Sequence, residues 1–326
     1  MSHFPAVTFD VLWGVSLAFA AMLIFAGCTL TVSVSAKNMG SGPGSFLAAT
    51  ASVAIGTLIV LMLWVGGKGV SVPNAGAVAA FALAGICSTY IGRWLVFKSI
   101  ELMGPSGSAG LQSLSPLITA VLGWIFLGEV IGTIGLVGIV LGIAGLLAMS
   151  MGIGRSQQKT SLQAKALGLV SRPGLVYSTL LVGVGSAAAY SLGHLFRAYG
   201  VRHWNEALLG TLIGAVAGLL ALAAANHQKM AQYLGQARLN PRAAGLYLAV
   251  GGFQFIAQAL VIAAMKYIPA GMAALIAMCT PLVVLPISYF ALRNAELLSG
   301  VTVLGVAITL VGITLLVLYG GAAPGF

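Results

Sequence analysis

Charged and aromatic side chains inside apolar stretches are the residues of this sequence best suited to bind a solute. The clearest is Arg93, which lies in an apolar stretch with Tyr90 and Trp94. A cation inside a bilayer costs at least about 2.5 kcal/mol on insertion scales, so Arg93 should face a cavity or a partner. We expect Arg93 to hold an anionic group and the two aromatic rings to shape the pocket. Lys98 and Glu101 fit an interfacial pair that reaches the headgroups.

Three glutamines extend this candidate binding site. Gln258 lies 165 residues after Arg93, and Gln254 precedes Gln258 by one helical turn. Together with Gln112, these amides would donate and accept hydrogen bonds with a polar solute.

A second polar cluster consists of Tyr190, His194 and Arg197, which share one helix face at their spacing. Histidine titrates near neutral pH, so both a coupling role and a structural role are open for His194. Arg197 is expected close to a helix end, with its side chain reaching the interface.

Acidic groups are few, and each is expected at a helix end or in a loop: Asp10, Glu101, Glu129, Glu206 and Glu296. Without a carboxylate in mid-membrane, the cavity should favour a carboxylate-bearing or electron-rich solute. The three cysteines (Cys28, Cys87 and Cys279) lack metal-binding spacing, so we expect no metal and no cofactor.

An enzyme is a weaker hypothesis. The segment 104–107 (GPSG) matches a short pattern of intramembrane serine proteases, with Ser106 as nucleophile and His194 as base. Ser106 aligns, however, with Gly271 in a second copy of the same helix start. A helix start explains both copies and a protease explains one, so we expect no enzymatic activity.

Composition sets the class of protein that carries these residues. Hydrophobic residues make up 60% of the 326 residues and charged residues 6%, with a mean hydropathy of +1.06. A soluble domain cannot bury so much apolar surface, so the chain should be a multi-pass integral membrane protein. The net charge of +10 is concentrated in loops, where it would meet lipid headgroups; no nucleic-acid partner is expected.

An internal repeat organises the chain. Pro116 and Pro281 lie 165 residues apart in similar apolar contexts, and each should interrupt the middle of a helix as a hinge or gate. We predict an all-α fold of ten transmembrane helices in two inverted five-helix repeats. The repeats are expected at 1–154 and 173–326, with a polar linker at 155–172. The predicted helices are 10–36, 44–65, 73–101, 105–127, 131–151, 174–198, 204–225, 241–265, 269–292 and 297–319.

Segments 97–149 and 266–318 resemble the end of an EamA-type domain, with a mid-helix proline, a Gly128-Glu129 break and a glycine-spaced last helix. In the second copy the segment 293–296 (RNAE) replaces the Gly-Glu pair. The chain thus resembles the ten-helix branch of the drug/metabolite transporter superfamily. This resemblance implies transport of a small solute with both termini in the cytoplasm. The Lys and Arg residues lie mainly in loops after odd-numbered helices, which predicts the opposite orientation.

We therefore expect a secondary transporter, working as an exporter, facilitator or exchanger of small polar metabolites such as amino acids or related carboxylates, by alternating access. A proton-coupled exporter of drugs and organic cations is the alternative, followed by a membrane scaffold or a lipid scramblase. The expected location is a bacterial inner membrane. Expected partners are a small-molecule substrate and lipids, with a monomer and a homodimer both open.

Overall fold

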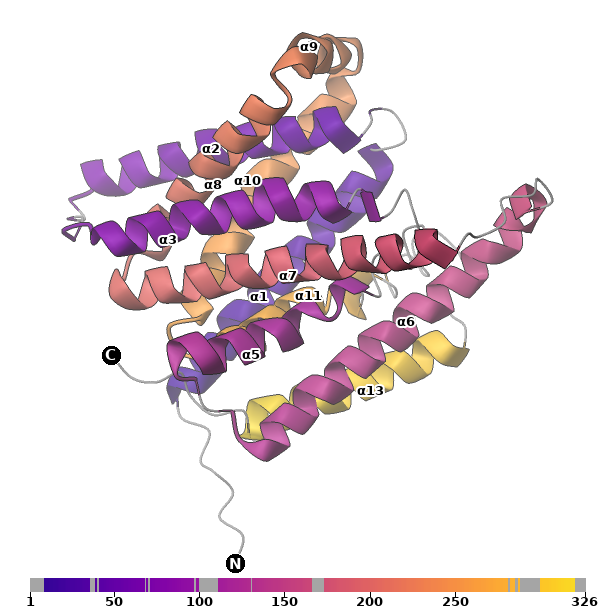
Figure 1. The fold of residues 1–326 in the computed structure, drawn as a ribbon. Coiled ribbons are helices and arrows are strands. Elements are labelled where there is room, and N and C mark those ends of the chain that lie inside the picture. Colours follow the sequence, from indigo (N-terminus) through magenta and orange to yellow (C-terminus); the bar gives the residue numbers. More distant parts are fainter. Residues whose placement is uncertain are drawn as a thin grey trace, which may run out of the picture.

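The structure, a computed structural model, describes residues 9–35, 39, 41–67, 69, 71–96, 98–99, 111–129, 131–165, 173–280, 282–284, 287 and 300–319. Within these ranges the fold is helical and contains no β-strand (Figure 1). The helices are α1 (Phe9–Ser35), α2 (Ser41–Val65), α3 (Ala75–Gly85), η1 (Ile86–Gly92), α5 (Ser115–Leu127), α6 (Thr133–Lys165), α7 (Pro173–His203), α8 (Ala207–Ala225), η2 (His227–Lys229), α9 (Met230–Leu239), α10 (Pro241–Ala264), α11 (Ala270–Met278) and α13 (Gly300–Tyr319).

The helices are long and apolar because the sequence offers runs of hydrophobic residues with few charges. Within the described residues, six helices have the length and hydropathy to cross a membrane. Shorter apolar helices occur at Ser115–Leu127 and Thr133–Ala148. Large apolar side chains such as Trp64 and Leu220, each 64% exposed, lie on the outer surface, as expected for a face in lipid. The total of ten crossings stays a prediction.

Four loops meet at one end of the bundle, which we call the Glu129 end. They contain Ser71, Glu129, Asn205 and Lys266, and hydrogen bonds join them to one another or to the ends of neighbouring helices. The opposite end, where α9 connects α8 to α10, is called the α9 end.

The two halves of the chain run in opposite directions between these ends. A Cβ atom at Gly14, near the start of α1, would lie 2.8 Å from Tyr267 Cβ at the Glu129 end. Arg202, near the end of α7, lies at this same end because it bonds Glu129. Helix α1 therefore begins where α7, its counterpart in the repeat, ends.

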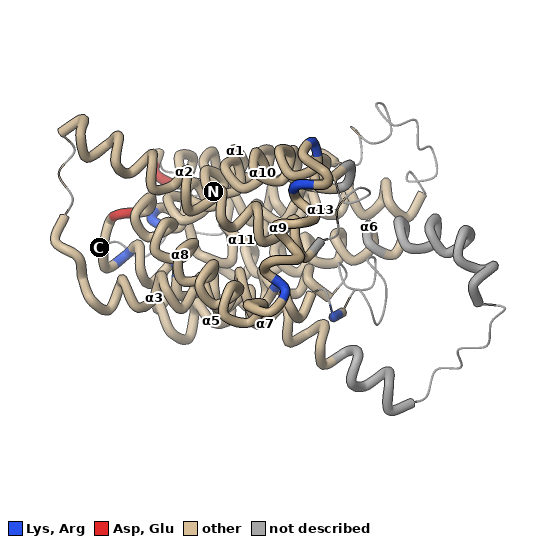
Figure 2. Tube along the Cα trace, turned by 90° about the horizontal axis from the view of Figure 1, so that it is seen from above, with Lys and Arg blue, Asp and Glu red and all other residues tan. Residues whose placement is uncertain are grey.

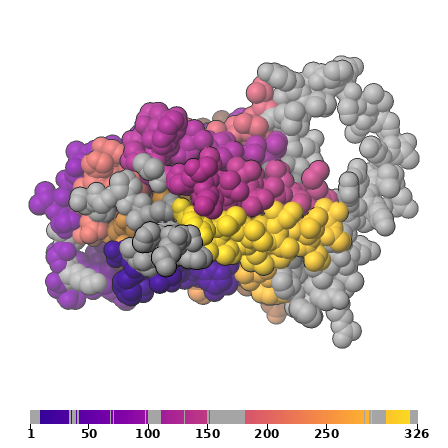
Figure 3. All heavy atoms as spheres, turned by 90° about the horizontal axis from the view of Figure 1, so that it is seen from below, coloured from indigo at the N-terminus to yellow at the C-terminus, as the bar shows by residue number. Residues whose placement is uncertain are grey.

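Helices α6 and α13 form a close antiparallel pair at one edge of the bundle, visible as adjacent magenta and yellow surfaces in Figure 3. The backbones approach because glycines face one another. A Cβ atom at Gly138 would lie 2.7 Å from the Gly312 carbonyl oxygen, and one at Gly145 would lie 2.6 Å from that of Gly305. Small residues permit this contact in lipid. These glycines of α6 and α13 thus allow the last helices of the two halves to pack together.

The core is formed by α10, α11 and the helices around them. Residues Ala270–Ala277 of α11 are all buried, which places this short helix at the centre of the bundle. Helices α3 and α8 cross closely, since a Cβ atom at Gly85 would lie 1.9 Å from the Gly214 carbonyl oxygen. Gly210, Gly214 and Gly218 of α8 all take part in this contact, because each faces α3 or η1.

Three helix boundaries differ from the predictions. Pro116 lies in the first turn of α5 instead of mid-helix, because the chain makes a turn at Ser113–Leu114 directly before it. Proline has no N–H and is tolerated in a first turn, where no donor is needed. Helix α6 continues to Lys165, so residues 155–165 of the expected linker are helical. Helix α7 continues to His203, five residues beyond its predicted end.

The second copy of the proline break is described only in part. Helix α11 ends at Met278, and Cys279 and Thr280 form a turn before the short helical segment 282–284. This turn lies one residue closer to the proline than the turn at Ser113–Leu114 does in the first half. Pro281 itself lies outside the described residues, as do Glu101, Ser106 and Glu296. The hinge roles of Pro116 and Pro281 stay predictions.

Candidate binding cavity

A cavity of about 450 Å³ lies inside the bundle. Helices α1, α2, α3, α7, α8, α10 and α11 all contribute to its wall, together with η1. Five of the residues predicted to bind the solute line it: Arg93, Tyr190, His194, Gln254 and Gln258. Hydroxyl groups complete its polar surface: Thr29, Ser52, Ser88, Thr89, Thr211 and Thr280. No acidic side chain is among the described residues that line it.

Arg93 reaches the cavity from a helix with a π-helical turn. Nη1 of Arg93 lies 3.5 Å from the Ser45 carbonyl oxygen on α2. The turn η1 directly precedes Arg93 and carries Ser88 and Thr89, which also line the cavity. A π-helical turn holds more residues than an α-helical one, so it rotates the residues that follow, and such turns are frequent at functional sites.

The aromatic residues beside Arg93 lie elsewhere. Trp94 is 61% exposed on the outer surface of the bundle, and Tyr90 is half-buried; neither is among the residues lining the cavity. In a regular α-helix, the spacing of four residues would place Tyr90 and Trp94 on one face. The π-helical turn changes that register, because the residues after it no longer follow the spacing of the residues before it.

Arg197 is a cavity residue that the sequence interpretation assigned to the interface. Arg197 is only 7% exposed, and its Nη2 donates a 2.5 Å hydrogen bond to Ser88 Oγ. Because α7 continues to His203, Arg197 lies more than a turn inside the helix and cannot reach the headgroups as predicted. The signal was present in the sequence, since Arg197 shares a helix face with Tyr190 and His194.

Two further polar atoms at the cavity have no hydrogen-bond partner among the described residues. They are Nδ1 of His194 and Nε2 of Gln258, and both atoms are buried. Buried polar atoms normally have partners, so unpaired ones beside a cavity are available for a solute or water. Gln254 lines the same wall of α10 one turn away.

Gln112 lies away from the cavity. Its amide donates to Ser186 Oγ on α7, and Ser115 and Ser191 join the same two segments by a 3.0 Å hydroxyl–hydroxyl hydrogen bond. These contacts form a polar seam between α7 and the start of α5. The residues described here give Gln112 a protein partner, and it does not line the cavity.

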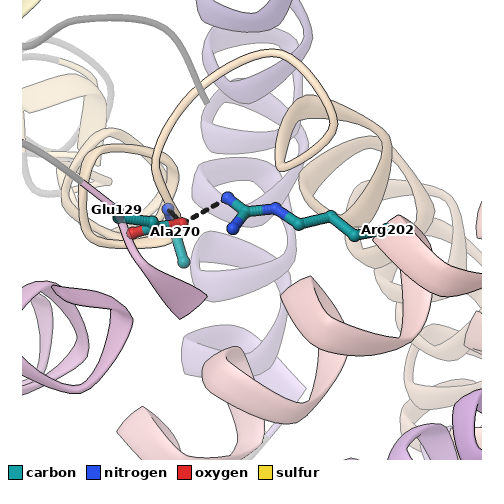
Figure 4. Close-up of polar contacts among 3 residues, drawn as sticks. All are labelled: Glu129, Arg202 and Ala270. Carbon is teal, nitrogen blue, oxygen red and sulfur yellow. Dashed lines mark hydrogen bonds and ion pairs between the residues drawn. The ribbon is translucent and has the colours of Figure 1, made fainter. Parts of the chain in front are cut away.

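A buried ion pair joins both halves at the Glu129 end (Figure 4). Glu129, which is fully buried, accepts hydrogen bonds from Arg202 of α7 and from the backbone N–H of Ala270, at 2.9 Å from the latter. Ala270 is the first residue of α11, so the carboxylate stabilises a helix N-terminus as well as a guanidinium. Sequence reasoning placed Glu129 at a helix break but did not find its partner.

Close to these residues in the sequence are four buried apolar residues, which we call the apolar layer. Ala198, Val201, Met265 and Ile268 are each 0% exposed and belong to one packed cluster. Nearby, Trp204 Nε1 donates to Ser71 Oγ at 2.9 Å, and Ser71 Oγ donates to Glu206 at 3.0 Å. The Glu129 end therefore combines a packed apolar layer with a polar network among its described residues.

The sequence profile of the EamA-like transporter family matches the chain twice, at residues 12–151 and at residues 177–318. The two matches begin 165 residues apart, which is the spacing of Pro116 and Pro281. Because they cover most of the chain, the protein belongs to the EamA-like transporter family. The resemblance identified from the sequence is confirmed, and the chain is a multi-pass membrane transporter of the drug/metabolite type built from two repeats.

The fold also resembles solved structures. One of them, described only as a crystal structure of a protein, aligns with a TM-score of 0.65 and 17% sequence identity. The alignment covers 93% of this chain and 97% of that chain, so the two share a fold over nearly their whole length. Among curated proteins, no match is found.

Proposed function

We propose that this transporter moves small polar metabolites, such as amino acids or related carboxylates, across the membrane by alternating access. The observation that carries the proposal is the cavity of about 450 Å³, which has the size of a small-molecule site. Its polar lining comes from both repeats, with Arg93 from the first and Tyr190 and Gln258 from the second. A site shared by two repeats is typical of secondary transporters.

In this proposal Arg93 attracts an anionic group, while Gln254 and Gln258 exchange hydrogen bonds with the rest of the solute. Tyr190 offers a ring and a hydroxyl group at the same wall. The protein acts in the bacterial inner membrane as an exporter, facilitator or exchanger. No cofactor takes part.

Alternating access requires the Glu129 end to open in one state. Opening it would separate the packed layer of Ala198, Val201, Met265 and Ile268 and the pair of Glu129 with Arg202. A buried ion pair is expensive to form, and here Oε2 of Glu129 and two guanidinium nitrogens of Arg202 have no partner among the described residues. A contact of this kind contributes little net stability, which suits a contact that must break during transport.

One observation favours the alternative, a proton-coupled exporter of organic cations. His194 is a titratable group in the cavity with an unpaired Nδ1, and it could exchange a proton during transport. The two arginines of the cavity, Arg93 and Arg197, oppose this function because they repel a cationic solute.

The test is flux in proteoliposomes that contain the purified full-length protein, with protein-free liposomes as the control. A panel of labelled amino acids, organic anions and organic cations is offered with and without a pH gradient. Saturable flux of an amino acid or anion that is lowered in Arg93→Gln supports the proposal. Gradient-driven flux of cations, abolished in His194→Gln, would instead support the alternative.

A further inference from the structure

Arg197 is a buried cation without an acidic partner among the described residues. Five residues further along the same helix, Arg202 is also buried but pairs with Glu129. Among the described residues, the Arg197 guanidinium donates one hydrogen bond, to Ser88 Oγ, and Ser88 Oγ in turn donates to the Ala84 carbonyl oxygen at 2.7 Å. Buried charges in proteins are normally paired, whereas Arg197 has no counter-charge within the part of the chain that the structure describes.

The charge of the cavity wall is positive. Arg93 and Arg197 both line it, and no carboxylate does so among the residues described. The C-terminal end of α11 offers an opposing partial charge on the backbone, since Ala277, Met278 and Thr280 reach the wall. A helix C-terminus is equivalent to about half a negative charge, which does not balance two guanidinium groups.

The charge of the solute follows from this balance. A zwitterion brings no net charge and leaves the wall as positive as before. A solute with one negative charge lowers the net charge of the two guanidinium groups by half, and a solute with two negative charges neutralises it. Electrostatic energies are large in a site shielded from water, so the net charge of a solute should dominate which solutes the cavity binds.

We propose that Arg197 determines the specificity of this cavity and selects small organic acids of net negative charge over zwitterions. Ser88 holds one arm of the guanidinium, and the remaining N–H groups of its planar fork match a carboxylate. His194, one turn before Arg197, and Gln258 supply the adjacent unpaired nitrogen atoms. The inference rests on the proposed transport function and narrows its substrate class.

The experiment compares succinate, glutamate and leucine, which carry two, one and no net negative charges at neutral pH, in proteoliposomes of the full-length protein. We expect the KM to be lowest for an anion and at least about tenfold higher for leucine, since charged hydrogen bonds are worth that much or more. In Arg197→Gln the KM of the anion should rise at least about tenfold, and Arg197→Lys should recover part of this loss. Arg238→Gln, which removes an exposed cation of α9, is the matched control and should leave KM unchanged.

Thermal unfolding of the detergent-solubilised protein separates binding from folding. Arg197→Gln without solute should unfold at the same temperature as the wild type or higher, because it removes an uncompensated charge. Succinate should raise the unfolding temperature of the wild type but not that of Arg197→Gln. If Arg197→Gln does not fold, the inference fails, because Arg197 then has a structural role.

The outcomes distinguish the two proposals. Absence of saturable flux for every probe would overturn the transport function, whereas the succinate-induced thermal shift would still test the anion site. Saturable flux of leucine with a KM equal to or below that of the anions would overturn the inference and leave transport intact. An unchanged KM for the anion in Arg197→Gln would likewise overturn the inference and leave transport intact.

Discussion

Ser88 orients Arg197 in the cavity, so it should affect substrate affinity without touching the bulk of the solute. In Ser88→Ala the guanidinium loses its 2.5 Å hydrogen bond. We expect the KM for an anionic solute to rise about tenfold, with the maximal rate less affected, because a hydrogen bond to a charged group contributes about 1.5–3 kcal/mol. Flux kinetics in proteoliposomes measure both quantities.

The matched control is Ser191→Ala. Ser191 lies on the same helix as Arg197, but its hydroxyl group bonds Ser115 in the seam with α5. Its loss should leave the KM at the wild-type value. An equal rise of KM in both variants would show that the effect of Ser88→Ala comes from a general disturbance of α7.

Lys266, in the loop between α10 and α11, should make stability depend on alkaline pH. Burial lowers the pKa of Lys266 below its ordinary value of 10.5, and the nearby Glu206 only partly opposes this. Between the lowered pKa and 10.5, the unfolded chain binds a proton that the folded protein has released, so stability rises with pH. Below the lowered pKa both states are protonated, and the full cost of burying the charge is present.

The difference in unfolding temperature between the wild type and Lys266→Met should therefore shift in favour of the wild type as the pH is raised toward 10.5. Lys229→Met, which removes an exposed lysine of η2, controls for the loss of a charge. A wild-type protein that loses stability relative to Lys266→Met over this range would contradict the prediction.

Single residues differ in how well the sequence predicts them. Arg93, His194 and Gln258 were predicted as site residues because polar groups inside apolar runs have few other uses, and all three line the cavity. Arg197 was misplaced because its position depended on where α7 ends, and helix ends are the least certain part of a prediction. The pairing of Glu129 with Arg202 joins residues 73 positions apart, and no local pattern encodes it.

Among the elements, helices α6 and α13 pack against each other through direct backbone contact at their glycines. A Cβ atom at Gly312 would lie 2.4 Å from the backbone nitrogen of Gly142, so any larger side chain must push the helices apart. We expect Gly312→Val to lower the unfolding free energy by about 1–3 kcal/mol, as overpacked sites do, and to lower the unfolding temperature in detergent accordingly.

Gly27→Val provides the comparison for this variant. Gly27 lies inside α1, and a Cβ atom there would meet nothing within 4 Å. Both substitutions carry the same change in helix propensity, so their difference reports the contact alone. Equal unfolding temperatures for the two variants would contradict a close approach of α6 and α13.

Element identity was easier to predict than element register. The glycine spacing common to both repeats indicated where the last helix of each half would lie, because close packing in lipid needs small residues. The π-helical turn η1 left no comparable pattern. Trp94 was therefore expected in the pocket beside Arg93, whereas the structure places it on the outer surface.

At the scale of the whole molecule, charge is distributed unevenly between the two ends. Figure 2 shows the acidic segments together at one end of the bundle and basic segments at both. Lys229, Arg238 and Arg242 are exposed at the α9 end. Arg197 and Arg202 are buried, so they no longer count as loop charges of the Glu129 end. The asymmetry noted in the sequence thus becomes stronger.

Since basic loops stay in the cytoplasm, this asymmetry predicts a cytoplasmic α9 end. A cysteine in place of the exposed Gln232 of α9 should react with an impermeant maleimide only when the cytoplasmic face is accessible. The same protein without the added cysteine gives the background from Cys28, Cys87 and Cys279. Labelling from the outer face would support the orientation that the family resemblance implies.

The ion pair at the Glu129 end connects both repeats, so breaking it should change the whole molecule. Glu129→Gln leaves Arg202 buried without a counter-charge, which should cost about 3–5 kcal/mol of stability. It should also expose the apolar layer, so that Val201→Cys reacts faster with a maleimide applied at that end. Removing both charges in Glu129→Gln with Arg202→Met should restore part of the stability, and no recovery would contradict a pairwise effect.

In the proposed alternating-access cycle, a state closed at the Glu129 end makes the two faces of the membrane unequal for any compound that competes for the cavity. A compound offered at the Glu129 end can bind only the fraction of molecules that has opened there, so its apparent dissociation constant is the intrinsic one divided by that fraction. The same compound offered at the α9 end does not depend on the opening of the Glu129 end. Inhibition should therefore be one-sided at low concentration, and Glu129→Gln, which favours opening, should make the potencies from the two faces more alike.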